Sequence, residues 1–310
     1  MNTDVPDLGS KPDTVADAKC GFEQLGCWLE AAWANRAQVH HIDIDDAQIA
    51  CRIWGNESDS KPSLLFVHGF RANARWWDHI APDFADRFRV VAFDLSGMGD
   101  SGRRQNYSRL QFARELVGVI ERLKLHRPTV IAHSFGTLVA LHAAALAPDA
   151  LGRLILIDGY PTGFLRLPEA RERLYADRAS ILSRYRFDPP GRWPDPRITT
   201  YLANASIRET EHGWTWKFDP AATETLKLDV SRPDVGHVGQ PVDAIFADLT
   251  EIVPRDRISN IGRWLPTCGR PIKIYNCHHH VMIEQPQALV SVLSALLSRD
   301  QVDDDVKPPA

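Results

Sequence analysis

The sequence lacks the long apolar runs that mark membrane proteins. No stretch of its 310 residues approaches the roughly 20 consecutive apolar residues that a membrane-spanning helix needs. Residues 1–19 are polar and contain no apolar segment of the kind found in secretory signal peptides. We therefore expect a cytoplasmic protein without a membrane partner.

Paired cysteines and an excess of one charge are missing as well. The five cysteines are odd in number and form no CxxC pair, which is typical of reduced thiols and argues against a disulfide framework. Lysine and arginine (36) nearly balance aspartate and glutamate (40), and no long basic run is present, so nucleic acid is not an expected partner. We expect a small-molecule substrate, bound by a monomer or a homodimer.

What the chain does contain is an alternation of apolar runs and helical patterns. The strand candidates are 48–55, 63–69, 89–96, 128–134, 153–159, 242–248 and 271–277. Several of these runs show no polar alternation, which is typical of parallel strands buried on both faces. Helical patterns at 109–125 and 138–148 lie between them. The alternation predicts an α/β fold with a doubly wound parallel sheet.

Residues 160–238 interrupt this alternation, because they contain no convincing buried strand. They hold a helical pattern at 169–187, several prolines and the aromatic cluster GWTWKFDP at 213–220. An insertion here predicts a helical cap over the carboxyl edge of the sheet, where open α/β folds bind ligands. The predicted organisation is a flexible tail (1–19), a first part of the core with an amphipathic helix at 22–36 (20–159), the cap (160–238), a second part of the core (239–300) and an acidic tail (301–310).

Ser134 is the candidate nucleophile. It stands in AHSFG (Ala132–Gly136), after an apolar strand and before a helical pattern, which is the context of a G-x-S-x-G nucleophile elbow with alanine in place of the first glycine. The sharp turn requires small residues on either side of the serine, and the helix N-terminus favours developing negative charge. After another strand, Gly69 lets the chain turn toward Ser134, so the backbone N–H groups of Phe70 and Phe135 are expected to form an oxyanion hole.

These motifs, together with FDLSGMGDSG (93–102) and HHHVMIEQP (278–286), resemble the α/β-hydrolase superfamily over residues 39–297. The resemblance implies a mostly parallel eight-stranded sheet with a cap inserted after the sixth strand. It also implies a Ser-His-acid triad that works without a cofactor. By the spacing of the family's motif, the base is His279, five residues before Glu284; His280 is the alternative, and His278 is expected to serve loop structure.

The acid is left open by the sequence. Relatives place it after the seventh strand, where this chain has Thr250 instead of an aspartate. Glu251 or Asp248 in the same loop can replace it, or Asp158 at the end of the sixth strand can, and we favour Asp158. The three adjacent histidines also permit a metal site, but successive side chains at a strand end diverge and no second ligand cluster is evident, so we expect no metal.

The residues around these motifs suggest the chemistry. We expect a serine esterase that cleaves a small, hydrophobic ester, lactone or thioester; the alternatives are carbon–carbon bond hydrolysis on the same triad and ligand binding without turnover. Trp76, Trp77, Trp193 and Phe218 can line an apolar pocket or simply pack the cap. The candidate substrate-binding residues are Arg71, Phe164, Trp214, Trp216 and Met282.

Overall fold

The computed structural model describes residues 15–55, 61–160, 171–191, 195–229 and 231–305. Its centre is an eight-stranded sheet with the spatial order β1-β2-β4-β3-β5-β6-β9-β10. The strands are β1 (Gln38–Ile44), β2 (Ala47–Trp54), β3 (Ser63–Val67), β4 (Arg89–Phe93), β5 (Thr129–His133), β6 (Arg153–Ile157), β9 (Val242–Ala247) and β10 (Ile272–Ile274). The predicted doubly wound, mostly parallel eight-stranded sheet is confirmed.

The order and direction of the strands determine at which edge of the sheet a ligand can bind. The strands β4, β3, β5, β6, β9 and β10 pair in parallel in this order, whereas β2 runs antiparallel to both β1 and β4. The strand β3 lies between β4 and β5. The chain therefore continues from β3 to a strand on one side of it, β4, and then crosses to a strand on the other side, β5. At such a switch point the carboxyl ends of neighbouring strands open a crevice. The segments after β3 and β5, which carry Gly69 and Ser134, border it.

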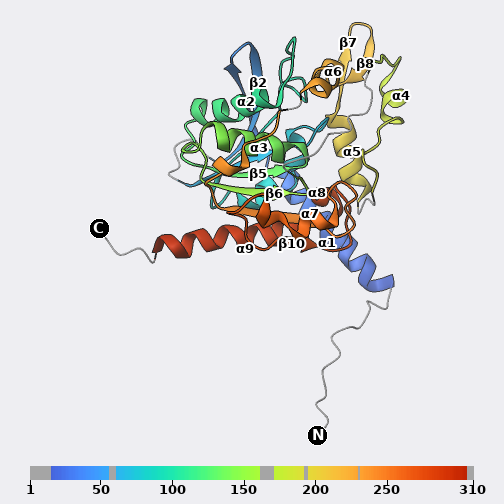
Figure 1. The fold of residues 1–310 in the computed structure, drawn as a ribbon. Coiled ribbons are helices and arrows are strands. Elements are labelled where there is room, and N and C mark those ends of the chain that lie inside the picture. The colour runs from blue at the N-terminus through green and yellow to red at the C-terminus, as the bar shows by residue number, and fades with distance from the viewer. Residues whose placement is uncertain (1–14, 56–60, 161–170, 192–194, 230, 306–310) are drawn as a thin grey trace.

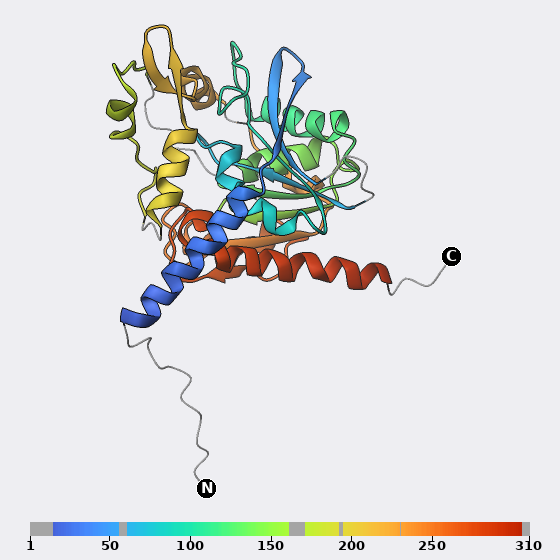
Figure 2. The ribbon, with the colours of Figure 1, turned by 180° about the vertical axis from the view of Figure 1, so that it is seen from behind.

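Helices cover both faces of the sheet (Figures 1 and 2). One face packs against α2 (Arg109–Arg122) and α3 (Phe135–Leu146), and the other against α1 (Val15–Ala34) and α9 (Pro286–Asp305). Because side chains alternate along a strand, β5 sends Val130 and Ala132 into the first core and Ile131 into the second. Burial on both faces explains why the central strands are continuous apolar runs.

The segment between β6 and β9 contains helices and a hairpin. Its elements are α4 (Arg178–Leu182), α5 (Pro196–Ala205), β7 (Ile207–Thr210), β8 (Gly213–Trp216), α6 (Pro220–Leu228) and the 3-10 turn η3 (Val235–His237). The inserted segment contains the expected helices and, in addition, a hairpin that the sequence did not indicate: β7 and β8 pair antiparallel, and Gly213, at φ 121°, takes a backbone conformation at the turn that other residues rarely adopt.

The helical pattern at 169–187 is also wrong for most of its described length. Only α4 is helical there, because Tyr175 exchanges both backbone hydrogen bonds with Trp214 of β8 (2.9 and 2.8 Å) and is thereby held extended. The side chain of Asp177 then accepts a hydrogen bond from Ser180 N–H and starts the short helix. The sequence pattern reflects the helix propensity of these residues. Pairing with a strand that is distant in the sequence overrides that propensity.

The two terminal helices reach into the segments that were expected to be tails. The first begins at Val15, inside the expected flexible tail, and the last continues to Asp305, inside the expected acidic tail. Once a helix is nucleated, each added residue gains a hydrogen bond at little cost, so both helices extend beyond the segments that the apolar pattern marks. Among the described residues, no helix combines the length and apolar character that crossing a membrane requires.

The remaining short elements flank the crevice and the second half of the core. They are η1 (Ala74–Trp77), η2 (Ala81–Phe84), α7 (Arg255–Ser259), η4 (Ile261–Arg263) and α8 (Val281–Glu284).

Candidate active site

Ser134 forms the sharp turn between β5 and α3. The strand ends at His133 and the helix begins at Phe135, so the serine alone makes the turn, at φ 53° and ψ −119°. A side chain at positive φ is strained and persists only where its surroundings enforce it. The close approach of α3 also requires Gly136, since a Cβ there would lie 2.7 Å from the His68 carbonyl oxygen. The turn presents Ser134 to a pocket.

His279 connects Ser134 to Asp158. Its Nε2 lies 2.8 Å from Ser134 Oγ, and its Nδ1 lies 2.7 Å from Asp158 Oδ2. Because a carboxylate only accepts, Nδ1 carries the hydrogen and Nε2 accepts the serine hydroxyl. His279 is 3% exposed and Asp158 is fully buried. In this geometry a histidine can take a proton from a serine while a carboxylate fixes its tautomer.

Asp158 is held in place by two further donors. It follows β6 at φ 44°. The N–H of Ala247 donates to its Oδ1 (3.1 Å), and the hydroxyl of Thr250 donates to its Oδ2 (2.7 Å). Thr250, the residue that departs from the family pattern, thus supports a carboxylate supplied by the neighbouring strand.

The other candidate acids and bases lie elsewhere. Glu251 is exposed, and Asp248 accepts a hydrogen bond from Cys277 N–H (3.2 Å), so neither takes the place of Asp158 beside the histidine. His278 is bound to Glu284 through its backbone N–H and its Nδ1, both at 3.1 Å, as expected for a loop residue. His280 directs its Nε2 to the Pro189 carbonyl (3.0 Å).

The two backbone amides expected to form the oxyanion hole have no other hydrogen-bond acceptor among the described residues. Within the described part of the chain, the N–H groups of Phe70 and Phe135 donate to no other group. The loop passes the serine closely, because a Cβ on Gly69 would lie 3.2 Å from Ser134 Cβ. Amides that keep their hydrogens free beside a nucleophile can stabilise negative charge on a substrate oxygen.

Buried side chains fix this loop. His68 donates from Nδ1 to the Gly69 carbonyl (2.7 Å) and accepts the Leu95 N–H at Nε2 (3.1 Å). Burial lowers the pKa of His68 to about 4, so it stays neutral and serves as a structural residue. Asp94 binds the Ala74 N–H (2.6 Å) and thereby holds the start of η1.

The serine opens into a cavity of about 950 Å³ between the sheet edge and the inserted segment. Of the candidate substrate-binding residues, Arg71 and Trp216 line it, together with Trp76 and Phe218. Tyr175, Tyr185 and Phe187 also line it; sequence reasoning missed them because they lie in the segment predicted to be helical. The cavity wall therefore carries several aromatic side chains.

Several other candidates do not reach the cavity. Met282 belongs to α8, and its side chain is fully buried in the core, because the short helix turns it inward. Its carbonyl accepts a hydrogen bond from His79. Trp214 of β8 and the buried Trp77 are not among the residues lining the cavity. Phe164 and Trp193 lie outside the described residues.

The cavity wall and its rim carry more positive than negative side chains. The cationic ones are Arg71, Arg171, Arg173, Arg184, Arg186 and Lys217, against Glu172 and Asp188. Arg71 lies next to the oxyanion loop, with its guanidinium 5.1 Å from the centre of the Phe218 ring. Its guanidinium makes no hydrogen bond or ion pair with the residues that the structure describes. The chain as a whole has a formal charge of −4, so positive charge is locally enriched here.

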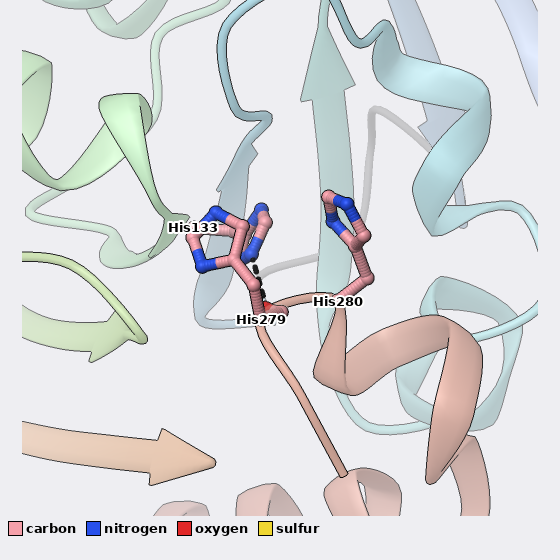
Figure 3. A group of neighbouring side chains, drawn as sticks. All are labelled: His133, His279 and His280. Atoms are coloured by element: carbon pink, nitrogen blue, oxygen red, sulfur yellow. Dashed lines mark hydrogen bonds between the residues drawn. The ribbon is translucent and has the colours of Figure 1, made fainter. Parts of the chain in front are cut away.

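His279 also belongs to a group of three imidazoles. Figure 3 shows His133 from the end of β5 beside His279 and His280, which precede α8. One ring nitrogen from each lies within 4.8 Å of those of the other two. The expectation that the adjacent histidines diverge is therefore wrong for His279 and His280, and the last residue of β5 supplies a third imidazole. Burial lowers the pKa of His280 to about 3 and holds that of His133 well below its usual value, so both rings are neutral.

The doubly wound sheet, the serine on a strand–helix turn and the insertion after the sixth strand together define the architecture of a hydrolase of the α/β class. A model of the alpha/beta hydrolase family matches residues 64–292. The chain therefore belongs to the alpha/beta hydrolase family, and the prediction of a hydrolase is confirmed.

Relatives of known name agree with this assignment. Esterase Rv0045c of Mycobacterium tuberculosis is 27% identical over 292 residues, which span 89% of this chain and 95% of the esterase. A serine hydrolase-like protein of Danio rerio is 29% identical, over 91% of this chain and 95% of its own length.

Solved structures share the fold at lower identity. The crystal structure of the same mycobacterial esterase has a TM-score of 0.72 at 24% identity, covering 89% of this chain and 97% of that chain. An E-2-(acetamidomethylene)succinate hydrolase has a TM-score of 0.73 at 21% identity, covering 84% and 99%.

Proposed function

We propose that the protein is a serine esterase in which Ser134 is the nucleophile, His279 the general base and Asp158 the acid of a triad. The observation that carries this proposal is the unbroken chain of hydrogen bonds from Ser134 Oγ through His279 to Asp158, at 2.8 and 2.7 Å. The likeness to a mycobacterial esterase over most of both chains supports ester cleavage rather than another reaction of the fold.

The chemistry proceeds in two halves. Ser134 Oγ attacks the ester carbonyl carbon while His279 Nε2 takes the hydroxyl proton, and the carbonyl oxygen becomes an oxyanion between the Phe70 and Phe135 amides. Collapse breaks the bond to the alcohol oxygen, to which His279 returns the proton, and leaves an acyl-enzyme. Water, activated by the same nitrogen, then releases the acid and restores the serine. The Asp158 carboxylate stabilises the imidazolium in both halves.

The cavity favours a hydrophobic acyl group that carries a negative charge. Trp76, Tyr185 and Trp216 offer apolar surface to the acyl chain. Arg71 lines the same space. Its guanidinium makes no hydrogen bond to the described residues, although the Asp188 carboxylate acts on it electrostatically, so it can bind a substrate carboxylate in bidentate fashion. The other cations at the rim raise the local concentration of anions. The proposed substrate is therefore a small ester or thioester with an acidic group on its acyl side.

The test uses a matched pair of substrates, p-nitrophenyl hexanoate and the p-nitrophenyl monoester of adipic acid, which adds a terminal carboxylate to an acyl chain of the same length. We expect both to be hydrolysed by the wild type, with a higher kcat/KM for the anionic ester, and neither by Ser134→Ala. Arg71→Met should lower kcat/KM for the anionic ester by about tenfold. Hydrolysis of the neutral ester should remain largely intact, so the preference is lost. The control Arg122→Met, on the exposed side of α2, should change neither.

Two results would overturn parts of the proposal. Hydrolysis that persists in Ser134→Ala would exclude Ser134 as the nucleophile. A wild type that hydrolyses neither ester and does not react with a fluorophosphonate would instead favour ligand binding without turnover.

A further inference from the structure

The main chain of His279, the base of the proposed triad, is held by the side chain of His133. The His279 carbonyl oxygen accepts a hydrogen bond from His133 Nε2 at 2.9 Å, which Figure 3 marks by a dashed line. Among the described residues, this is the only hydrogen bond to the main chain of His279. A carbonyl only accepts, so the hydrogen of the His133 ring is on Nε2. The residue that precedes the nucleophile therefore donates to the residue that acts as base.

The residues that precede the base in its loop have separate anchors. The N–H of Cys277 donates to Asp248 Oδ1 (3.2 Å), and the carbonyl of Cys277 accepts from the Leu249 N–H (3.1 Å). The N–H of His278 donates to Glu284 Oε2 (3.1 Å). None of these hydrogen bonds reaches the main chain of the base itself, which leaves its position to His133.

The His133 ring also packs against the ring of the base. The centres of the two rings lie 4.7 Å apart, with an interplanar angle of 41°. His133 is 2% exposed and is the last residue of β5, so the sheet fixes its place. Burial holds the pKa of His133 well below its usual value, so this ring adds no positive charge beside the imidazolium that forms on His279.

We propose that His133 is a positioning residue, which sets the place and the tilt of the His279 imidazole relative to Ser134 Oγ. This inference rests on the proposed function, because it assigns a role in the same triad. Asp158 holds Nδ1 of the base and fixes its tautomer, whereas His133 fixes the main chain from which the ring extends. His133 takes no proton itself. Because it is consecutive with Ser134, one strand end both presents the nucleophile and positions the base.

The expected effect follows from how sensitive proton transfer is to geometry. A displacement of about 1 Å between reacting groups can cost about 10²-fold in rate. Without the His133 donor, the His279 carbonyl has no hydrogen-bond partner among the described residues, and His279 is only 3% exposed. A buried carbonyl without a partner is unfavourable, so the loop shifts to find one and takes the imidazole with it.

Substitutions of two matched histidines separate positioning from stability. His133→Leu removes the N–H donor and keeps apolar bulk. His133→Gln keeps an amide N–H at the place of Nε2, whereas His133→Asn puts its amide at the place of Nδ1, away from the carbonyl. His79→Leu is the control, because His79 is also fully buried and donates from Nε2 to a backbone carbonyl, that of Met282 (2.7 Å). A loss of stability alone would appear in both leucine variants.

Steady-state hydrolysis of the p-nitrophenyl esters gives the first readout. We expect kcat of His133→Leu and of His133→Asn to fall by about tenfold, as for the loss of one buried hydrogen bond, with KM little changed. His133→Gln should recover most of that loss, and His79→Leu should stay within about twofold of wild type. In an Asp158→Asn background, His133→Leu should cost little more, because residues that act through the same base are not additive.

Proton NMR reads the position of the base without any substrate. The hydrogen on His279 Nδ1, in its 2.7 Å hydrogen bond to the Asp158 carboxylate, should give a resonance far downfield, which Asp158→Asn removes and thereby assigns. We expect this resonance to persist in His133→Gln and in His79→Leu. It should weaken or broaden in His133→Leu and in His133→Asn.

The inference is wrong if folded His133→Leu and His133→Asn keep the kcat of wild type, or if His79→Leu loses as much kcat as they do. If His133→Leu does not fold, His133→Asn against His133→Gln decides alone. A wild type that hydrolyses no ester would count against the proposed function. In that case a resonance that weakens in His133→Asn supports the positioning role, and one that is the same as in wild type overturns it.

Discussion

Replacement of Asp158 by asparagine tests the assignment of the triad acid. Asp158 Oδ1 accepts from Ala247 N–H, while Oδ2 accepts from both Thr250 and His279. An asparagine that keeps its oxygen toward Ala247 presents its NH₂ group to His279 Nδ1. The imidazole must then move its hydrogen to Nε2, where it points at Ser134 and can no longer accept the serine proton. The opposite orientation sets NH₂ against the buried amide of Ala247 and leaves that donor unsatisfied.

The expected loss is large and specific to kcat. A histidine held in the wrong tautomer lowers kcat by about 10⁴-fold, which corresponds to about 5.5 kcal/mol of transition-state stabilisation. KM should change little, because the aromatic wall and Arg71 are untouched. The assay is steady-state hydrolysis of the p-nitrophenyl esters, with circular dichroism to verify the fold. Glu251→Gln and Asp248→Asn are the controls and should stay within about twofold of wild type. An Asp158→Asn enzyme that keeps a tenth of its activity, or a comparable loss in either control, would refute the assignment.

Three smaller predictions follow from the same structure. Thr250→Val removes a 2.7 Å hydrogen bond to the buried carboxylate, so kcat should fall by about tenfold; unchanged kinetics would show that the contact is unimportant. The free energy of unfolding in urea should be about 1 kcal/mol higher for Ser134→Gly than for Ser134→Ala, because only glycine adopts φ 53° without strain. Equal free energies would mean that the turn is relaxed. Burial lowers the pKa of His68 and His79 from 6.5 to about 4. The unfolded chain therefore binds more protons between these values, and the stability present above pH 6.5 is lost as the pH falls toward 4. His133 and His280, whose pKa values burial also lowers, add to this loss, and Asp94, whose pKa burial raises to about 6, opposes part of it. The free energy of unfolding should therefore fall between pH 7 and pH 5, and a flat profile in urea titrations would refute this reasoning.

The parts of the fold that the sequence predicts are those whose signal is local. Strands β3 and β4 are buried along their whole length, so they read as unbroken apolar runs. The turn at Ser134 was recognisable because its small neighbours and the flanking strand and helix are contiguous in sequence. The position of His279 came from the family's spacing, and the structure brings it into contact with Ser134 and Asp158.

What the sequence did not predict depends on contacts between distant residues. Tyr175 is extended because it pairs with Trp214, 39 positions along the chain, and no local pattern encodes that partner. Thr250 looked like a missing acid because its hydrogen bond to Asp158 crosses from one strand end to another. The group of His133 with His279 and His280 likewise joins two segments that meet only in the folded sheet.

The measurement that tests the central claim most directly is intact-mass and peptide-mapping mass spectrometry after treatment with a fluorophosphonate. We predict one phosphonyl group per chain, located on Ser134, with labelling abolished in Ser134→Ala and strongly slowed in Asp158→Asn. An unlabelled wild type, or a label on any other residue, would contradict the claim that Ser134 is the activated nucleophile.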